Sequence, residues 1–309
     1  MDALLSALRA VAETTRLRLL WLLSRAELNV SELTQILGQS QPRVSRHLKV
    51  MCEAGLLERH KEGSWVLFRL SREAEWGSQI AAMIPEADSV LAGDRARLEA
   101  VRAARAERAG AYFRANARDW HRLRQLHVRE EAVEASLKRL AGPGPFACVA
   151  DLGTGTGRML EIFAPGAQRA LGVDLSHEML AIARSRLEGL PQAEVRHADI
   201  THVPLGNGAA DLVILHQVLH FLEDPLAALS EAARILAPGG HLLIADFAPH
   251  EREELRDKHA HRRLGFAPAQ MADYLGRAGL AVLAHEDLPP PAEPAGGLTV
   301  SVWLAGRKA

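Results

Sequence analysis

The stretch DLGTGTG, residues 151 to 157, places Gly153, Gly155 and Gly157 at alternate positions. Glycines at this density let the backbone turn tightly and approach a ligand closely, a pattern typical of nucleotide-binding turns. A dinucleotide fingerprint requires Gly-x-Gly-x-x-Gly, but position 158 is Arg. The spacing therefore departs from that of a dinucleotide site.

Three acidic residues stand where a ligand at this turn would need them. Asp151 precedes the turn, Asp174 ends the run ALGVD and Asp199 ends VRHAD. Asp151 would disfavour a pyrophosphate and suit an ammonium group, Asp174 can accept both hydroxyls of a ribose, and Asp199 can accept from an adenine amine. Because no cluster of Lys or Arg surrounds the glycines, these residues favour an adenosine ligand without phosphates, such as S-adenosylmethionine. A tight turn without a ligand is the alternative.

Histidines are numerous after residue 170. One interpretation is an acceptor pocket in which His216 or His220 removes a proton as a methyl group transfers. A second is a metal site that uses His259 and His261, and a third is that the histidines are loop residues with satisfied hydrogen bonds. Methyl transfer needs little acid–base help, because the sulfonium is a strong electrophile and alignment supplies much of the rate.

The elements that position these residues follow a strand–loop–helix rhythm. Near-continuous apolar runs separated by helical stretches predict a parallel sheet covered on both faces. The runs lie at 146–150, 170–173, 212–215 and 242–245. LAVLAHEDL and LTVSVWLA, which are joined by a Pro/Gly-rich loop without a helix, predict an antiparallel pair at one sheet edge.

Residues 146 to about 305 resemble a class I S-adenosylmethionine-dependent methyltransferase. The motifs VADLGTGTG, LGVDLSHEML, HADI, ADLVILHQVLHFLEDP and ILAPGGHLLIADF occur in the order of that family. The resemblance implies an α/β Rossmann-like domain with seven strands and S-adenosylmethionine or S-adenosylhomocysteine as cofactor. Together with the acids above, it gives the expected cofactor-binding residues as Asp151, Gly153, Gly155, Gly157, Asp174, Leu175, Met179, Asp199, Ile200 and His216.

A different chemistry is expected near the N-terminus. Apolar residues at helical spacing predict a helix within 4–24, a short helix that starts at Ser31 and ends at Gly38, and a third helix that Ser40 caps. Two short strands that turn at Glu62-Gly63 follow. Three helices and a hairpin predict a mainly-α winged helix-turn-helix domain.

The third of these helices carries side chains suited to reading DNA. In a major groove Arg hydrogen-bonds guanine, and Ser or Gln can hydrogen-bond more than one kind of base. Basic residues on a wing contact phosphates. The predicted DNA contacts are Gln41, Arg43, Ser45, Arg46, His47 and Lys49 on the helix, with Arg59 and Lys61 on the wing. A solvated charged face is the alternative.

Residues 4–70 resemble the ArsR-type winged-helix repressors through ALRAVAETTRLRLLWLL and SELTQILGQSQPRVSRHLKVMCEAGLLERHKEGSWVLFRL. The resemblance implies a homodimer on a palindromic operator of double-stranded DNA. Many such metal sensors carry cysteines in the helix that begins here as ELNVSEL, where Asn29 and Ser31 cannot supply thiolates. We therefore expect no metal site there and expect the attached domain to sense the signal.

Between these parts lies an arginine-rich helical stretch. Ten arginines and three acids occur between Arg95 and Arg129, a local charge of +7. We expect a dimerisation helix over 73–108 and a cofactor lid over 110–128; contacts to DNA phosphates or a solvated helix are the alternatives. The expected domains are 1–92, 93–145 and 146–309.

Composition sets further bounds. The 309 residues suit two or more domains, and a net charge of −1 means that any DNA contact must come from a local patch. Two isolated cysteines fit a reducing cytoplasm, and no apolar run approaches the length that crosses a bilayer. We expect a cytoplasmic transcriptional regulator whose second domain either senses the adenosyl ligand as effector or is an active methyltransferase on a small-molecule acceptor.

Overall fold

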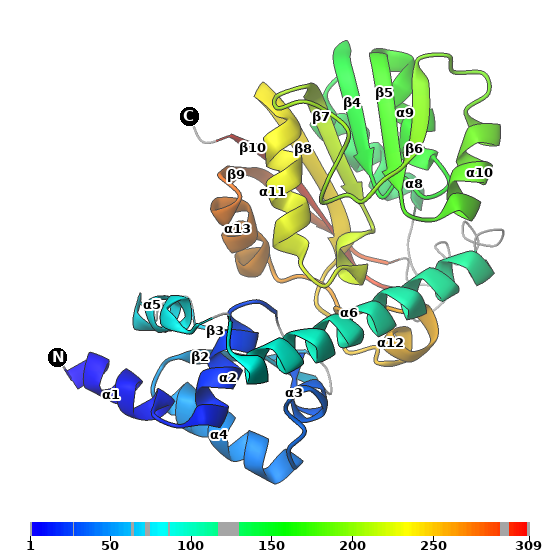
Figure 1. Cartoon of the computed structure of the whole chain (residues 1–309). Helices are drawn as coiled ribbons and strands as arrows, with labels where there is room; N and C mark the ends of the chain where they lie inside the picture. The colour runs from blue at the N-terminus through cyan, green and yellow to red at the C-terminus, as the bar shows by residue number, and fades with distance from the viewer. Residues whose placement is uncertain are drawn as a thin grey trace. The chain divides into compact units, whose positions relative to one another are not determined.

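The computed structural model describes residues 2–26, 28–62, 65–71, 75–85, 87–116, 130–290 and 297–307. The chain divides into two compact units, Met1–Arg108 and Ala109–Ala309, which are described separately (Figure 1). The long helix α6 (Ser89–Asn116) begins in the first unit and ends in the second. Among the described residues, no helix is long and apolar enough to cross a membrane.

The first unit is a winged helix-turn-helix domain. Its elements are α1 (Asp2–Val11), α2 (Thr14–Leu23), β1 (Leu28–Asn29), α3 (Val30–Leu37), α4 (Gln41–Glu53), β2 (Leu57–Glu62), β3 (Trp65–Leu70) and α5 (Glu75–Met83), followed by α6. The three strands form an antiparallel sheet in the order β1-β3-β2. The predicted helix that ends at Gly38, the helix after Ser40 and the hairpin are confirmed, although the Ser40 side chain makes no capping hydrogen bond. The predicted turn at Gly63 lies outside the described residues.

Two local boundaries differ from the sequence expectation. The stretch 4–24 forms two helices, because the Glu13 carboxylate caps α2 by accepting from the backbone N of Arg16 at 3.0 Å. Helix α3 is capped by Asn29 rather than Ser31. Asn29 Oδ1 accepts from Glu32 N, and Glu32 Oε2 accepts from Asn29 N, each at 3.0 Å. This reciprocal capping box satisfies two backbone donors that would otherwise lack partners.

Helix α6 is anchored to the first unit by a buried ion cluster. Asp94 is fully buried, and its oxygens accept from Arg18 Nε and Nη2 at 2.6 Å and from Arg97 Nη2 at 2.7 Å. Hydrogen bonding to Asp94 raises the pKa of Arg18. Arg97 Nε also donates to the carbonyl of Ile36, and Arg18 Nη2 to that of Leu37 at 3.4 Å. The cluster thus satisfies carbonyls at the C-terminal end of α3, which precedes α4.

The second unit contains a seven-stranded sheet in the order β6-β5-β4-β7-β8-β10-β9. Strands β6, β5, β4, β7 and β8 are parallel, and β10 is antiparallel to both β8 and β9. The strands are β4 (Phe146–Leu152), β5 (Ala167–Asp174), β6 (Ala193–His197), β7 (Ala210–His216), β8 (Leu236–Phe247), β9 (Leu280–Leu288) and β10 (Val300–Arg307). The Rossmann-like sheet and its antiparallel edge are confirmed.

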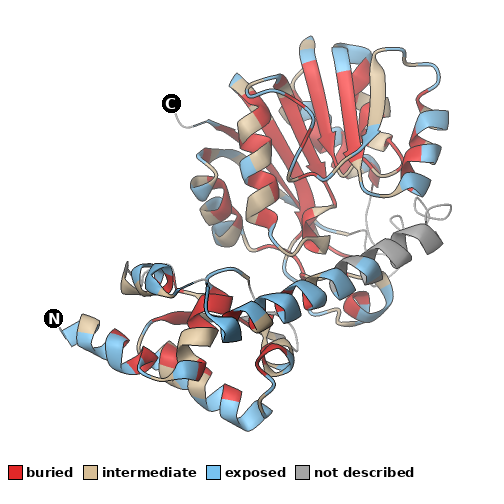
Figure 2. Cartoon of the chain, in the orientation of Figure 1, coloured by how far each residue is buried: buried red, intermediate tan, exposed pale blue. Residues whose placement is uncertain are grey.

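Helices cover this sheet on both faces. They are α8 (Glu130–Ala141), α9 (Arg158–Phe163), α10 (His177–Arg186), α11 (Pro225–Ile235), α12 (Glu254–His259) and α13 (Pro268–Arg277). Leu212 and Val213 are consecutive in β7 and both fully buried, yet Leu212 packs in the cluster with α8 and α9, and Val213 in the cluster with α11 and α13. Figure 2 shows the buried central strands. Burial on both faces explains their continuous apolar runs.

Replacing Asp94 by Ala tests the α6 anchor. We expect the free energy of unfolding of the first unit to fall by about 3 kcal/mol, because two guanidinium groups lose a buried partner. The measurement is denaturant unfolding of the full chain. Glu99→Ala, which removes an exposed ion pair with Arg102 on the same helix, is the control and should change stability by less than about 1 kcal/mol. Equal effects of the two variants would contradict a structural role for Asp94.

Candidate functional site

The glycine turn connects β4 to α9 at the carboxyl end of the parallel sheet. Gly153, Gly155 and Gly157 all adopt positive φ, at 78°, 53° and 81°. A Cβ at Gly153 would also lie 2.5 Å from Val218 Cγ2, which is closer than atoms can approach. The turn thus requires glycine for its backbone conformation and, at Gly153, for the chain that follows β7.

Asp174 joins the end of β5 to this turn. Its Oδ2 accepts from Gly155 N at 2.9 Å, and its Oδ1 accepts from Ser176 N at 2.8 Å. Burial raises the pKa of Asp174, even though these backbone donors stabilise the charged form. Each carboxylate oxygen retains capacity for a further hydrogen bond, so two adjacent ligand hydroxyls would stabilise the charged form further.

The other two predicted acids lie on the neighbouring strands. Asp151, near the end of β4, is 1% exposed, and its Oδ2 accepts from Thr154 Oγ1 at 2.6 Å. Asp199 is exposed just after β6, and its Oδ1 accepts from the backbone N and the Oγ1 of Thr201, both at 2.8 Å. Because β4, β5 and β6 are adjacent and parallel, the fold brings the three acids to the carboxyl ends of neighbouring strands.

The remaining predicted cofactor residues differ in exposure. Leu175 follows Asp174 and is 61% exposed, whereas Met179 on α10 and Ile200 after Asp199 are buried. His216 is the last residue of β7 and is also buried. Leu175 is therefore better placed than Met179 to offer an apolar surface to a ligand.

Arg158, the residue that breaks the dinucleotide spacing, is bound by acids. Its Nε and Nη2 donate to the two oxygens of Glu134 on α8, each at 2.7 Å, and its Nη1 donates to Glu161 at 2.8 Å. Hydrogen bonding to Glu134 raises the pKa of Arg158. The guanidinium anchors α8 to the turn, and its five donors are largely committed to carboxylates rather than to a phosphate.

His220 and Asp246 form a buried pair at the carboxyl ends of β7 and β8. His220 lies in the short helix η3 (Leu219–Phe221) after β7, and its Nδ1 is 2.7 Å from Asp246 Oδ1 near the end of β8. Both side chains are almost completely buried. Since the carboxylate can only accept, His220 carries its proton on Nδ1 in the neutral ring. The sequence points to His220 as a candidate base, but no local pattern pairs it with Asp246.

The ring of His261 packs on His220, with centroids 4.2 Å apart. His259 ends α12, and burial lowers its pKa. Within the described ranges, no group of three His, Cys, Asp or Glu side chains is placed to hold a metal ion. His220 and His261 therefore pack ring against ring, with their planes tilted by 38°.

Helix α4 has one buried apolar face and one exposed polar face. Val44, Leu48 and Met51 are buried in the core of the first unit. Of the predicted contacts, Gln41, Arg43, Ser45, Arg46 and Lys49 are exposed, as is Arg59 on β2. His47 is half-buried, with Nδ1 3.8 Å from Glu13 Oε2. Lys61 lies on β2, paired with Val66 of β3.

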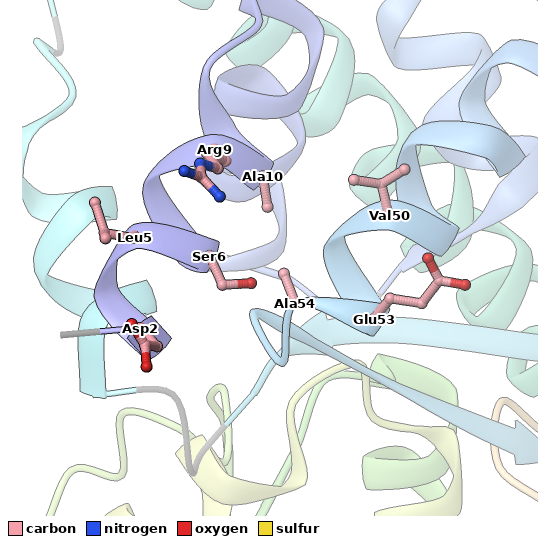
Figure 3. A pocket seen from close by; sticks show the side chains of 8 residues that line it. All are labelled: Asp2, Leu5, Ser6, Arg9, Ala10, Val50, Glu53 and Ala54. Carbon is pink, nitrogen blue, oxygen red and sulfur yellow. The ribbon is translucent and has the colours of Figure 1, made fainter.

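A cavity of about 570 Å³ also lies in the first unit, between α1 and α4 (Figure 3). Its lining residues are Asp2, Leu5, Ser6, Arg9, Ala10, Val50, Glu53 and Ala54. It contains none of the predicted ligand-binding acids. The apolar residues Leu5 and Leu8 of α1 are each nearly half exposed.

Family models match both units. Residues 13–59 match the bacterial regulatory protein arsR family, and residues 150–244 match the methyltransferase domain family. The chain joins an ArsR-type helix-turn-helix domain to a class I methyltransferase domain. The ArsR-type match contains α3 and α4, and the methyltransferase match contains the glycine turn and all three acids.

Individual relatives match part of this chain. Demethylmenaquinone methyltransferase of Thermus thermophilus is 39% identical over 131 residues, or 40% of this chain and 56% of that protein. An uncharacterized 37.1 kDa protein of a Streptomyces fradiae transposon is 41% identical over 109 residues, or 34% of this chain and 31% of that protein. The chain thus spans between about a third and somewhat over half of these relatives.

The fold is shared with solved methyltransferase structures. A chain in the complex of the Haloferax volcanii Trm112 methyltransferase activator with a methyltransferase has a TM-score of 0.54 and 23% identity. The alignment covers 63% of this chain and 98% of that one. At this identity the likeness supports the methyltransferase fold alone.

Proposed function

We propose that the methyltransferase domain binds S-adenosylmethionine or S-adenosylhomocysteine, and that this ligand is the effector of the ArsR-type DNA-binding domain. The observation that carries the proposal is the placement of Asp174. It is held by the glycine turn, buried enough to raise its pKa, and able to accept two more hydrogen bonds. The vicinal hydroxyls of an adenosyl ribose are donors that match this demand.

The rest of the proposed site follows from the same edge of the sheet. Asp199 would accept from the adenine amine, Leu175 would offer an apolar surface to the base, and Asp151 would favour the ammonium group. The engagement of Arg158 by Glu134 and Glu161 leaves this edge suited to a ligand without phosphates. The site would then be supported from the protein interior by three buried residues, Met179, Ile200 and His216.

The joining of the two domains in one chain supports an effector role. A ligand shifts an equilibrium between DNA-binding states only by its differential affinity for those states. Adenosyl binding would therefore make promoter binding depend on the cellular concentration of S-adenosylmethionine or S-adenosylhomocysteine. Under this proposal the protein is a cytoplasmic regulator of transcription.

Double-stranded operator DNA and a second copy of the chain are the proposed partners. The exposed polar face of α4, with Arg59 and Lys61 on the wing, would contact the operator. The half-exposed Leu5 and Leu8 of α1 support a homodimer, since paired apolar side chains lose water-exposed surface.

The His220–Asp246 pair favours a second candidate function, an active methyltransferase on a small-molecule acceptor. The carboxylate orients the imidazole, so that its Nε2 lone pair is available to remove a proton from an acceptor as the methyl group transfers. His216 is the other candidate base. The Thermus relative is named as a methyltransferase of demethylmenaquinone; no acceptor is assigned to this chain.

Replacing Asp174 by Ala tests the adenosyl site. We expect S-adenosylhomocysteine to bind roughly 10- to 100-fold more weakly, because two hydrogen bonds to a charged group are lost. Isothermal titration calorimetry measures the affinity, and DNA binding without ligand should survive. Asp257→Ala, an exposed acid on α12, is the control. An unchanged affinity in Asp174→Ala would refute the ribose role.

Replacing Arg46 by Ala tests the DNA-reading helix. We expect specific duplex binding to weaken by about 1–3 kcal/mol, because an arginine that reads a base edge contributes on this scale. Fluorescence anisotropy with a duplex selected by the protein itself provides the measurement. Arg184→Ala, an exposed arginine on α10, is the matched control. If the two variants bound the duplex equally well, α4 would not be the reading helix.

A further inference from the structure

The residue directly after β7 has a strained backbone. Gln217 has a φ of 51°, in the left-handed region that residues with a Cβ rarely adopt. Its backbone N donates to the carbonyl of Ala245 on β8 at 2.7 Å, which holds it in this conformation. Strain of this kind persists where the surroundings enforce it and clusters at ligand-binding sites.

The side chain of Gln217 is unsatisfied as well. Only 6% of the residue is exposed, and its buried Nε2 has no hydrogen-bond partner among the described residues. A buried amide donor without an acceptor is costly to the fold. Strain and an unmet donor at one position indicate that Gln217 is held for a group that brings an acceptor.

A second unmet donor, on His250, lies shortly after the carboxyl end of β8. The Nδ1 of His250 accepts from Arg252 N at 3.3 Å, so the ring proton of neutral His250 is assigned to Nε2. That Nε2 is buried and has no hydrogen-bond partner in the described part of the chain. Burial, aided by the nearby His220 and arginines, lowers the pKa of His250 to about 4. The ring is therefore a neutral N–H donor at physiological pH.

Two cationic side chains near His250 and in the segment after α12 are buried. Arg256 and Arg263 are both buried, which is rare for arginine. The segment that carries them is tied to the site, because Arg262 N and Arg263 N donate to the carbonyl of His220 at 2.9 and 3.1 Å. The nearby anions are already engaged: Asp246 with His220, Glu223 with Arg262, and Glu253 with Arg256.

We propose that this cluster at the carboxyl ends of β7 and β8 binds a carboxylate. Two unmet neutral donors and two buried guanidinium groups match an anion that offers several acceptors. The cluster adjoins the adenosyl site, since Val218, next to Gln217, packs against Gly153 of the glycine turn. The inference rests on the proposed function. The carboxylate is either that of the amino-acid part of the adenosyl ligand or that of a separate small molecule.

The test replaces Gln217 by Glu in the full chain. The substitution keeps the side-chain size but exchanges the amide donor for a negative charge, which would repel a bound carboxylate. Gln270→Glu on α13, half-buried and outside the cluster, is the matched control. His250→Ala removes the second donor without adding a charge and decides the question should Gln217→Glu fail to fold. Calorimetry measures the affinities for S-adenosylhomocysteine and for its decarboxylated analogue. Thermal unfolding measures how far benzoate raises the melting temperature, in the presence and in the absence of either adenosyl compound.

Two results would support the site and identify its source. If Gln217→Glu weakens S-adenosylhomocysteine at least tenfold but spares the decarboxylated analogue, the ligand's own carboxylate occupies the cluster. If both adenosyl compounds bind as before but benzoate no longer raises the melting temperature, a separate carboxylate occupies it. His250→Ala should follow the same pattern to a smaller extent.

Two results would overturn it. Unchanged binding of all three compounds would show that neither donor meets a carboxylate. Equal weakening of both adenosyl compounds with benzoate unaffected would mean a general disturbance of the domain. Failure of wild-type protein to bind either adenosyl compound would instead refute the proposed function. The carboxylate site would then be judged by benzoate alone, whose loss in Gln217→Glu would support it and whose persistence would refute it.

Discussion

The carboxylate of Asp174 is the interaction on which the second domain's site depends. It accepts from the backbone of Gly155 on one side and of Ser176 on the other, so it fixes the glycine turn of β4 relative to the end of β5. Burial raises its pKa, because desolvation disfavours the charged form. Hydroxyl donors from a ribose would satisfy it, and a pyrophosphate would repel it. Under the proposed function, this carboxylate would discriminate between ligand classes more than the glycines do.

The first domain depends on a comparable buried acid. Asp94 holds Arg18 and Arg97, whose guanidinium groups also reach the carbonyls of Ile36 and Leu37 at the end of α3. Helix α6, which carries Asp94, continues covalently into the unit that contains the sheet. A displacement of α6 would therefore act on the end of the helix that precedes the DNA-reading helix. Under the proposed function, this contact gives ligand binding a physical route to the operator.

Much of the fold was predictable from the sequence, because burial on both sheet faces leaves continuous apolar runs such as 212–215. The glycine turn and the acids at the strand ends were predictable for the same reason, since strand ends follow from the runs. Other features depend on contacts distant in sequence. The pairing of His220 with Asp246 requires the alignment of β7 with β8, and the strain at Gln217 has no local signature. The break at Glu13 was missed because apolar spacing continues across it.

The proposed function requires that adenosyl binding in the second domain changes operator binding in the first. The most direct measurement titrates S-adenosylhomocysteine and methyl-labelled S-adenosylmethionine into the full-length protein on its selected duplex, following DNA affinity and label transfer in the same samples. We expect saturating adenosyl ligand to change duplex affinity by roughly 5-fold or more, within the usual range of allosteric coupling, without any requirement for turnover. Tight adenosyl binding with an unchanged duplex affinity would contradict it.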